Sequence, residues 1–148
     1  MHTRLYEFIE NSGQFYDKHF GFRKKYSTNH ALLNIVEGIR ENLDNKTFAC
    51  GVFIDLEKAF DTVNHQILLT KLEHYGIRGT ANKWFASYIS SRRQKVRLDD
   101  AYSEFRSISC GVPQGSILGP LLFLIYINDM RNAVKHSVVH HFADDTNK

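Results

Sequence analysis

Acidic residues stand directly after two apolar runs of this sequence. Asp55 follows the run at residues 48–54, and Asp144 and Asp145 follow the run at residues 138–143. An apolar run that ends in an acid is typical of a buried strand that presents its last side chain at a sheet edge, where ligands usually bind. Carboxylates brought together there would repel one another unless a cation neutralised them. If the two strands are neighbours, we therefore expect a cation site where they meet.

Oxygen ligands of this kind favour a hard divalent cation. Carboxylates without an ordered set of cysteine or histidine ligands suit Mg²⁺ or Mn²⁺ better than zinc. Two such ions about 3.5–4 Å apart stabilise the attacking and leaving oxygens in phosphoryl transfer, so the arrangement predicts nucleotidyl transfer. Acids at strand ends are more commonly caps or surface groups, and that interpretation stays open. Zinc bound by His136, His140, His141 and Cys110 is disfavoured, because adjacent histidines of a strand point to opposite faces.

Periodic apolar residues predict the elements that must carry these acids. Helical spacing and capping residues occur in five segments: up to Ser12-Gly13, from Ser27 or Thr28 to Leu43, from Asn64 to Gly76, from Thr80, and from Ile117 or Pro120 to Val134. Alternation at residues 94–98 and 105–109, separated by Asp99-Asp100, predicts a hairpin. Residues 111–116 contain Pro113 and two glycines and predict a loop. The helix after that loop is apolar on nearly all sides at residues 121–127, which indicates deep burial.

Length and composition indicate one folded domain. The 148 residues, 43% hydrophobic and 24% charged, suffice for one core and are too few for two comfortable ones. The net charge is only +3, but cations cluster at residues 23–25 and 92–97. Such clusters suit a polyanion such as nucleic acid, while an ordinary solvated edge explains each cluster equally well.

Cysteine usage and hydropathy bear on the compartment. Cys50 and Cys110 lie in apolar or strand-like contexts, and we expect two buried thiols in a reducing compartment. No signal peptide pattern opens the sequence, and the apolar run at residues 121–127 is too short to span a membrane. We expect a soluble intracellular protein, with nucleus and cytoplasm not distinguished.

Four segments together resemble a known family. Residues 53–61 (FIDLEKAFD), 111–120 (GVPQGSILGP) and 142–145 (FADD) look like the three palm blocks of reverse transcriptases, most closely the non-LTR retrotransposon type. Residues 20–23 (FGFR), followed by Ser27-Thr28, resemble the block just upstream in the same group. An ordered set of four such blocks is very specific, whereas any one of them would be weak.

The resemblance implies an α+β fold: a polymerase palm with an antiparallel sheet packed by helices on one face, plus partial helical fingers. It implies a single partial domain, with partial fingers at residues 1–46 and the palm core at residues 47–148. Nothing before Phe20 resembles the arginine-containing fingers block. We also find no counterpart of the lysine-bearing end of the palm, the primer grip or the thumb, and we expect a piece of a polymerase.

The resemblance also assigns the metal site. Asp55 and Asp144 would ligate two Mg²⁺ or Mn²⁺ ions, with Asp145 beside them and the Leu56 carbonyl on the nucleotide-bound ion. The reaction implied is that of an RNA-directed DNA polymerase, in which a DNA primer 3′-hydroxyl attacks a deoxynucleoside triphosphate opposite an RNA template. A different outcome remains open, namely a truncated retroelement remnant that at most binds nucleic acid. A receiver domain built on an acidic pair would need a parallel sheet, against which the predicted hairpin speaks.

Further residues are assigned to the nucleotide. Phe60 would be the steric gate against a 2′-hydroxyl, although a core aromatic would occupy the same place. The amides of Lys58 and Ala59 would face the triphosphate, as helix N-terminal amides face anions. Gln114 would lie against the incoming nucleotide or the template base, and Asp61 would be a structural hydrogen-bonding residue.

Several cations and aromatic residues are candidates for nucleic acid binding. We expect Arg23, Lys24, Lys95 and Arg97 to contact the nucleic acid backbone. The aromatic residues of the helix from Thr80 could stack on bases but are more often core at this spacing; they are Trp84, Phe85 and Tyr88.

Overall fold

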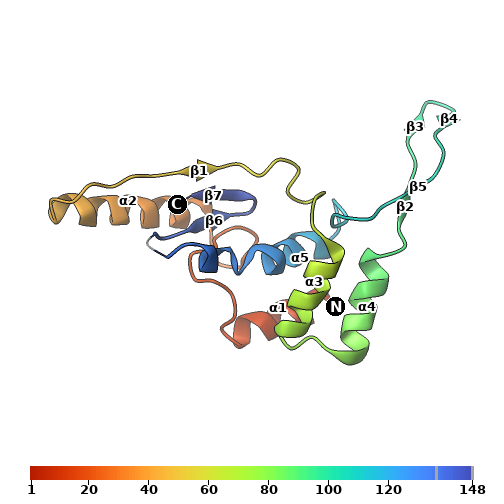
Figure 1. Ribbon diagram of the computed structural model, residues 1–148, viewed down its shortest axis with the longest axis horizontal. Helices are drawn as coiled ribbons and strands as arrows, with labels where there is room; N and C mark the ends of the chain where they lie inside the picture. Colours follow the sequence, from red (N-terminus) through yellow and green to blue (C-terminus); the bar gives the residue numbers. More distant parts are fainter. Residues whose placement is uncertain (136, 148) are drawn as a thin grey trace. The chain divides into compact units, whose positions relative to one another are not determined.

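The chain divides into two compact units in a computed structural model, which describes residues 1–135 and 137–147 (Figure 1). The first unit comprises Met1–Glu57 and Ile127–Lys148, and the second comprises Lys58–Tyr126. The expected boundary between partial fingers at residues 1–46 and the palm core at residues 47–148 stays a prediction. Helices and small antiparallel sheets make up both units, which confirms the expected mixture of helix and antiparallel strand.

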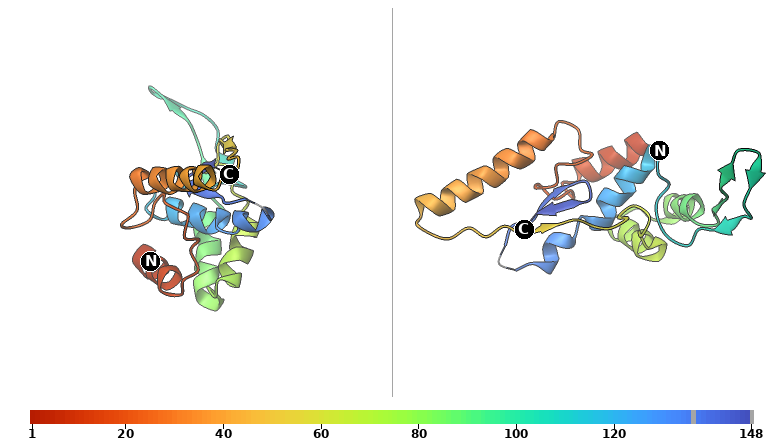
Figure 2. Two further views of the ribbon diagram at one scale, coloured as in Figure 1. Left: turned by 90° about the vertical axis from the view of Figure 1, so that its left-hand side faces the viewer. Right: turned by 90° about the horizontal axis from the view of Figure 1, so that it is seen from above.

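Two helices of the first unit agree with the sequence pattern, and the second begins where it predicted. Helix α1 (His2–Asn11) buries Leu5, Tyr6 and Ile9, as its apolar spacing indicated. Helix α2 (Thr28–Asp44) has Ser27 as its N-cap, whose backbone N–H donates to Nδ1 of His30 at 3.1 Å. Helix α2 runs beside strand β6 (Figure 2), yet most of its apolar side chains remain exposed.

The first unit also contains a three-stranded antiparallel sheet in the order β1-β7-β6. Its strands are β1 (Phe53–Ile54), β6 (His140–Phe142) and β7 (Asp145–Asn147). The last run was expected to end at the aspartates, but the chain reverses at Ala143-Asp144 and returns as β7. The positive φ of Ala143, 57°, allows this two-residue turn. Strand β7 therefore separates β1 from β6.

The buried strand expected at residues 48–54 is wrong. Only Phe53–Ile54 pairs with β7, both residues are exposed, and Phe48 is fully exposed. An apolar pattern records side-chain type but not whether a second strand lies alongside, and among the described residues β1 pairs with β7 alone. The expectation of buried thiols fails as well, because Cys50 and Cys110 are both exposed.

The second unit contains helices α3 (His65–His74) and α4 (Gly79–Ile89), which pack together. Asn64 is the predicted N-cap of α3, and its side chain accepts from the Ile67 N–H at 3.1 Å. Gly76, at φ 93°, follows the C-cap as predicted.

A hairpin follows α4 in the second unit, as the alternating pattern predicted (Figure 1). Its strands pair as β2 (Arg93–Gln94) with β5 (Arg106–Ser107), and as β3 (Arg97–Leu98) with β4 (Ala101–Tyr102). The chain turns at Asp99-Asp100, and the positive φ of Asp99, 51°, suits a tight hairpin turn.

Helix α5 (Leu118–Ile127) confirms the predicted deep burial, since residues 121–125 are almost completely inaccessible to solvent. Pro120 lies in its first turn, as required. The helix ends at Ile127 instead of Val134, and a short 3₁₀ helix, η1 (Met130–Ala133), follows. None of the helices in the described part of the chain is long and apolar enough to cross a membrane.

Asn128 follows the last residue of α5 and is buried. Its Oδ1 accepts from the Tyr16 N–H at 2.8 Å, and its Nδ2 donates to the Gln14 carbonyl at 2.7 Å. The side chain thus binds the loop after α1 within the first unit. Helical periodicity does not predict these long-range hydrogen bonds of Asn128.

Candidate active site

The sheet of the first unit brings two of the three predicted carboxylates together. Ile54 pairs with Thr146 in the β1–β7 register, so the next facing positions are Asp55 and Asp145. Both residues line one pocket of about 470 Å³, together with Phe53, Ile54, Phe142 and four residues of α2. The expectation that Asp55 meets the pair from the far end of the chain is therefore met for Asp145.

Asp144 occupies a different place from Asp145. It is the second residue of the turn between β6 and β7, it is half-buried, and it does not line that pocket. Among residues 1–135 and 137–147, no three acidic, histidine or cysteine side chains are grouped closely enough to hold a metal ion. Asp144 is thus adjacent to Asp145 in the sequence, but the three carboxylates do not form one cluster.

The chemistry of these carboxylates fits a hard cation. Within the described residues, the side chains of Asp55, Asp144 and Asp145 form no ion pair and no hydrogen bond. Ionised carboxylates are acceptors only, and neighbouring ones gain from a shared cation. Asp55 and Asp145 on one pocket wall therefore suit Mg²⁺ or Mn²⁺, whose preferred ligands are oxygens.

Residues 58–62 form a tight turn at the start of the second unit. The Lys58 carbonyl accepts from the N–H groups of Asp61 at 2.9 Å and Thr62 at 3.1 Å, and Lys58 itself has a φ of 51°. The analogy of Lys58 and Ala59 with a helix N-terminus is not supported, because the next helix begins only at His65. Leu56 is half-buried and belongs to the first unit.

Phe60 packs as the core interpretation predicted. Its ring stacks on Phe123 of α5 with centroids 4.4 Å apart, and its carbonyl accepts from the Val112 N–H at 2.8 Å. The side chain is half-buried. One face of Phe60 therefore packs on the core of the second unit, and the role as a steric gate stays a prediction.

The loop at residues 111–116 lies against the turn at residues 58–62. The Gly111 N–H donates to the Val63 carbonyl at 2.7 Å, and Gly111 has a φ of 88°. A Cβ at this position would lie 2.8 Å from the carbonyl oxygen of Asp61, so glycine is required for both conformation and space. Two of the sequence blocks thus meet in the second unit through their backbones.

Gln114 and Asp61 form the side-chain link between these blocks. Nε2 of Gln114 donates to Oδ1 of Asp61 at 2.9 Å, and both side chains are exposed. Asp61 therefore acts as a hydrogen-bonding residue, as expected. Both line a pocket of about 620 Å³ that also includes Arg92 and Gln94 at the base of the hairpin. The sequence pattern indicated Arg92 only as a member of the basic cluster at residues 92–97 and did not predict its place in this pocket.

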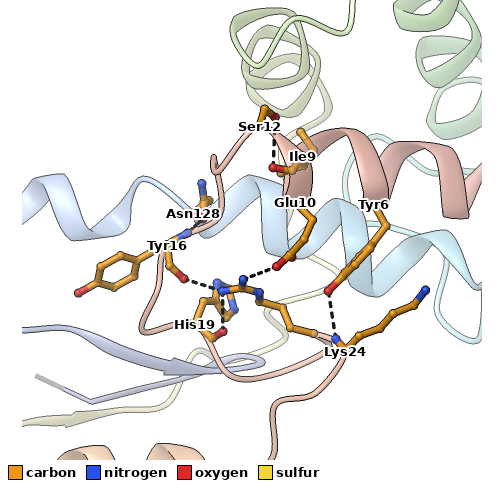
Figure 3. A network of polar contacts seen from close by, with 9 residues as sticks. Tyr6, Ile9, Glu10, Ser12, Tyr16, His19, Lys24 and Asn128 are labelled. Atoms are coloured by element: carbon orange, nitrogen blue, oxygen red, sulfur yellow. Dashed lines mark hydrogen bonds and ion pairs between the residues drawn. The ribbon is translucent and has the colours of Figure 1, made fainter.

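Arg23 is not at a nucleic acid surface. Its Nη2 forms an ion pair with Oε1 of Glu10 at 2.9 Å, and its Nη1 donates to the carbonyls of Tyr16 at 3.0 Å and His19 at 3.4 Å (Figure 3). The Arg23 side chain is 5% exposed. We correct the expectation for this residue, because a buried, paired guanidinium is not available to phosphates. Lys24 beside it is exposed.

Lys95 and Arg97 lie on the exposed hairpin among aromatic rings. Nζ of Lys95 is 3.9 Å from the ring centroid of Tyr102 and 5.2 Å from that of Phe105. The Arg97 guanidinium lies 5.7 Å from the Tyr102 centroid, and that of Arg93 lies 5.2 Å from the Phe105 centroid. Cations of one side of the hairpin therefore lie over aromatic rings of the other side.

The aromatic residues of α4 divide between core and surface. Phe85 is buried, as the core interpretation predicted. Trp84 and Tyr88 stack on one another with centroids 5.4 Å apart, and the Trp84 side chain is exposed. Of the three, Trp84 is exposed, Tyr88 is half-buried and Phe85 belongs to the core.

The histidines of β6 have separate neighbours, as strand alternation predicts. His140 contacts Oδ1 of Asn34 at 3.0 Å, whereas Nδ1 of His141 contacts Oγ1 of Thr146 at 3.0 Å. Burial lowers the pKa of His141 to about 4 and that of His19 to about 3. The positive charge that His140 would carry lowers the pKa of His141 further, and that of His141 lowers the pKa of His19 further. Both rings are neutral at pH 7. His136 lies outside the described residues.

Comparison with known proteins agrees with the sequence blocks. Residues 1–147 match the family described as "Reverse transcriptase (RNA-dependent DNA polymerase)". Two relatives come from Drosophila melanogaster transposons: "Probable RNA-directed DNA polymerase from transposon X-element" is 34% identical over 97% of this chain, and "Probable RNA-directed DNA polymerase from transposon BS" is 37% identical over 77%. "RNA-directed DNA polymerase from mobile element jockey" of the same species is 36% identical over 75%. The matches cover 16%, 12% and 12% of the lengths of these relatives, respectively.

Proposed function

This chain belongs to the reverse transcriptase (RNA-dependent DNA polymerase) family, and from that membership we propose that it carries the catalytic aspartates of an RNA-directed DNA polymerase. Its relatives at 34–37% identity are polymerases of non-LTR retrotransposons, which confirms the family and type that the four sequence blocks resembled. Because the chain spans only 12–16% of the length of these relatives, polymerase activity, substrates and partners are proposals for this protein.

The facing positions of Asp55 and Asp145 are the observation that carries this proposal. Both line one pocket although 89 residues lie between them in the chain, and Asp144 is the turn residue directly before Asp145. From the resemblance of the sequence blocks we assign Asp55 and Asp144 to two Mg²⁺ or Mn²⁺ ions, with Asp145, which faces Asp55, beside them and the Leu56 carbonyl on the nucleotide-bound ion. When bound, these ions would activate the primer 3′-hydroxyl and stabilise the charge of the transferred phosphate.

The protein residues around the nucleotide would bind and orient it. The exposed side chain of Lys58 and the backbone of the turn at residues 58–62 would face the triphosphate, with Ala59 within that turn. Phe60 would exclude a 2′-hydroxyl with the part of its ring that does not pack on Phe123. Gln114, held by Asp61, would contact the nucleotide or the template base. The first unit would hold the partial fingers and the palm strands.

The hairpin is the proposed contact for the RNA template and DNA primer. Its exposed cations, including Lys95 and Arg97, suit the phosphate backbone, and its exposed rings suit unpaired bases. Lys24 would add a second basic contact on the first unit.

Metal-dependent primer extension on an RNA template tests the proposal. It is measured for this chain and for this chain together with any coding sequence that flanks it. Asp55→Ala and Asp144→Ala should each abolish extension, whereas Asp100→Ala in the exposed hairpin turn should not. Extension retained in both variants of the site would refute the assignment. RNA binding without Mg²⁺-dependent nucleotide binding would instead favour a remnant that only binds nucleic acid.

A further inference from the structure

Residues 18–21 extend the sheet that carries the aspartate turn. The His141 N–H donates to the Lys18 carbonyl at 3.0 Å, and the Phe20 N–H donates to the His141 carbonyl at 2.8 Å. His19 thereby pairs in parallel with His141. Strand β6 thus has β7 on one edge and this segment on the other. A segment from the start of the chain therefore holds the strand that leads into Ala143.

Gly21 lies directly against the turn. A Cβ added at Gly21 would overlap the backbone nitrogen of Ala143 and would lie 2.9 Å from its Cα and 3.0 Å from the carbonyl carbon of Phe142. Gly21 is buried and its φ is not in the left-handed region, so glycine is needed here for space and not for conformation. The backbones of residue 21 and of the turn are in contact with no room for a side chain between them.

Buried side chains fix the strands on both sides of the turn. The rings of His19 and His141 pack with centroids 5.2 Å apart, and both residues have no exposed surface. The contact between Nδ1 of His141 and Oγ1 of Thr146 joins β6 to β7, and Thr146 is only 2% exposed. Asp144 and Asp145 lie between His141 and Thr146 in the chain, so the buried contact of these two residues fixes both ends of the segment that carries the aspartates.

The segment is itself held on its far side. The ion pair of Arg23 with Glu10 orients the guanidinium, whose Nη1 then donates to the carbonyls of Tyr16 and His19 (Figure 3). Helix α1, the loop and β6 thus form one continuous set of hydrogen bonds within the first unit. A shift of this loop must move His141, and with it the turn.

We propose that residues 18–21 position the Ala143-Asp144 turn, with Gly21 as the positioning residue that sets how Asp144 and Asp145 face the metal. This inference rests on the proposed function for its consequence, because it assumes that the aspartates bind a divalent ion. Its structural part does not depend on that assumption. The sequence block at residues 20–23 thereby has a role in positioning the last block, at residues 142–145.

Gly21→Ala tests the proposal, with Gly38→Ala as its matched control. Gly38 lies within α2, and a Cβ added there meets no atom within 4 Å. In the ¹⁵N-labelled chain, Gly21→Ala should shift the amide signals of Ala143 and Asp144, and Gly38→Ala should not. Signals of these two residues that stay at their wild-type positions in Gly21→Ala would overturn the proposal.

Mn²⁺ titration, followed by water proton relaxation, separates positioning from simple packing. Gly21→Ala should weaken Mn²⁺ binding by the folded chain about 10- to 100-fold, as loss of a group that orients metal ligands does. Lower stability with unchanged Mn²⁺ affinity would mean that Gly21 only packs, and would overturn the positioning role. Asp144→Ala serves as the reference: if it leaves Mn²⁺ binding unchanged, the proposed metal site fails, while the amide signals still decide whether Gly21 places the turn.

Hydrogen exchange in the wild-type chain decides the question if Gly21→Ala does not fold. The Phe20 and His141 amides bond reciprocally between the segment and β6, so they should open together and show equal protection. Rapid exchange of the Phe20 amide beside a protected His141 amide would show that the segment does not hold β6, and would overturn the proposal.

Discussion

Arg23 and Glu10 form an ion pair of 2.9 Å in which the Arg23 side chain is buried and the Glu10 side chain is partly exposed. The guanidinium also lies 4.5 Å from the ring centroid of Tyr26 and 5.2 Å from that of Phe15. The cation is therefore enclosed by rings, by backbone carbonyls and by its partner. Its neighbour Lys24 is exposed, although the two residues belong to one basic cluster of the sequence.

This difference predicts that substitutions of the two neighbours affect different properties. The Arg23 substitution should lower stability, and the Lys24 substitution should weaken RNA binding. Arg23→Met should lower the free energy of unfolding by about 3 kcal/mol, because it leaves Glu10 without its buried partner. Lys24→Met should change it by less than about 0.5 kcal/mol and should weaken RNA binding instead. Urea unfolding and RNA titration of both variants check this, and equal stability losses would contradict it.

The buried histidines predict a loss of stability in acid. The pKa values of His19 and His141 in the folded chain, about 3 and about 4, lie below the ordinary value of 6.5. Below pH 6.5 the unfolded chain therefore binds protons that the folded chain does not, and each histidine lowers the free energy of unfolding by about 1.4 kcal/mol per pH unit until its folded pKa is reached. Above pH 6.5 this contribution is constant.

Urea unfolding between pH 7.5 and 4.5 measures this dependence. His19→Phe removes one of the two protons, so its stability should fall less steeply with decreasing pH than that of the wild type. His74→Gln, on the exposed part of α3, should leave the slope unchanged. A slope that is the same in His19→Phe and the wild type would show that His19 does not contribute.

Phe60 predicts coupled effects on stability and sugar selection. Phe60→Val removes the ring that stacks on Phe123, which should cost about 1–3 kcal/mol of stability. If Phe60 is also the gate, the same variant should admit ribonucleotides, whereas Phe60→Tyr should preserve both the packing and the selection. The ratio of kcat/KM for deoxy- and ribonucleotides measures the second effect, and an unchanged ratio would leave Phe60 as a core residue only.

The hairpin predicts salt-dependent nucleic acid binding. Lys95→Ala and Arg97→Ala should each reduce the slope of log affinity against log salt concentration by about 1, because each removes one phosphate contact. Lys83→Ala, an exposed cation of α4 outside the hairpin, should not change the slope. Binding of single-stranded RNA at several salt concentrations measures this, and equal slopes in all variants would argue against the hairpin as the contact.

Local sequence determined much of the secondary structure. The N-cap Asn64, Gly76 after α3, the turn at Asp99-Asp100 and the place of Pro120 in α5 are all as expected. Each depends on interactions within a few residues, so the residue types suffice. The same holds for the family, because its blocks are short contiguous segments in a fixed order.

Only the tertiary structure decided which side chains meet. Asp55 faces Asp145 and not Asp144 because β7, a strand after the aspartates, pairs with β1 in one particular register. Arg23 is buried because Glu10 and the loop carbonyls enclose it, while the residue type alone suggested a surface cation. Gly21 lies against a turn that is more than 120 residues away in the chain. These relations depend on strand register and long-range packing, which the pattern of apolar and charged residues does not encode locally.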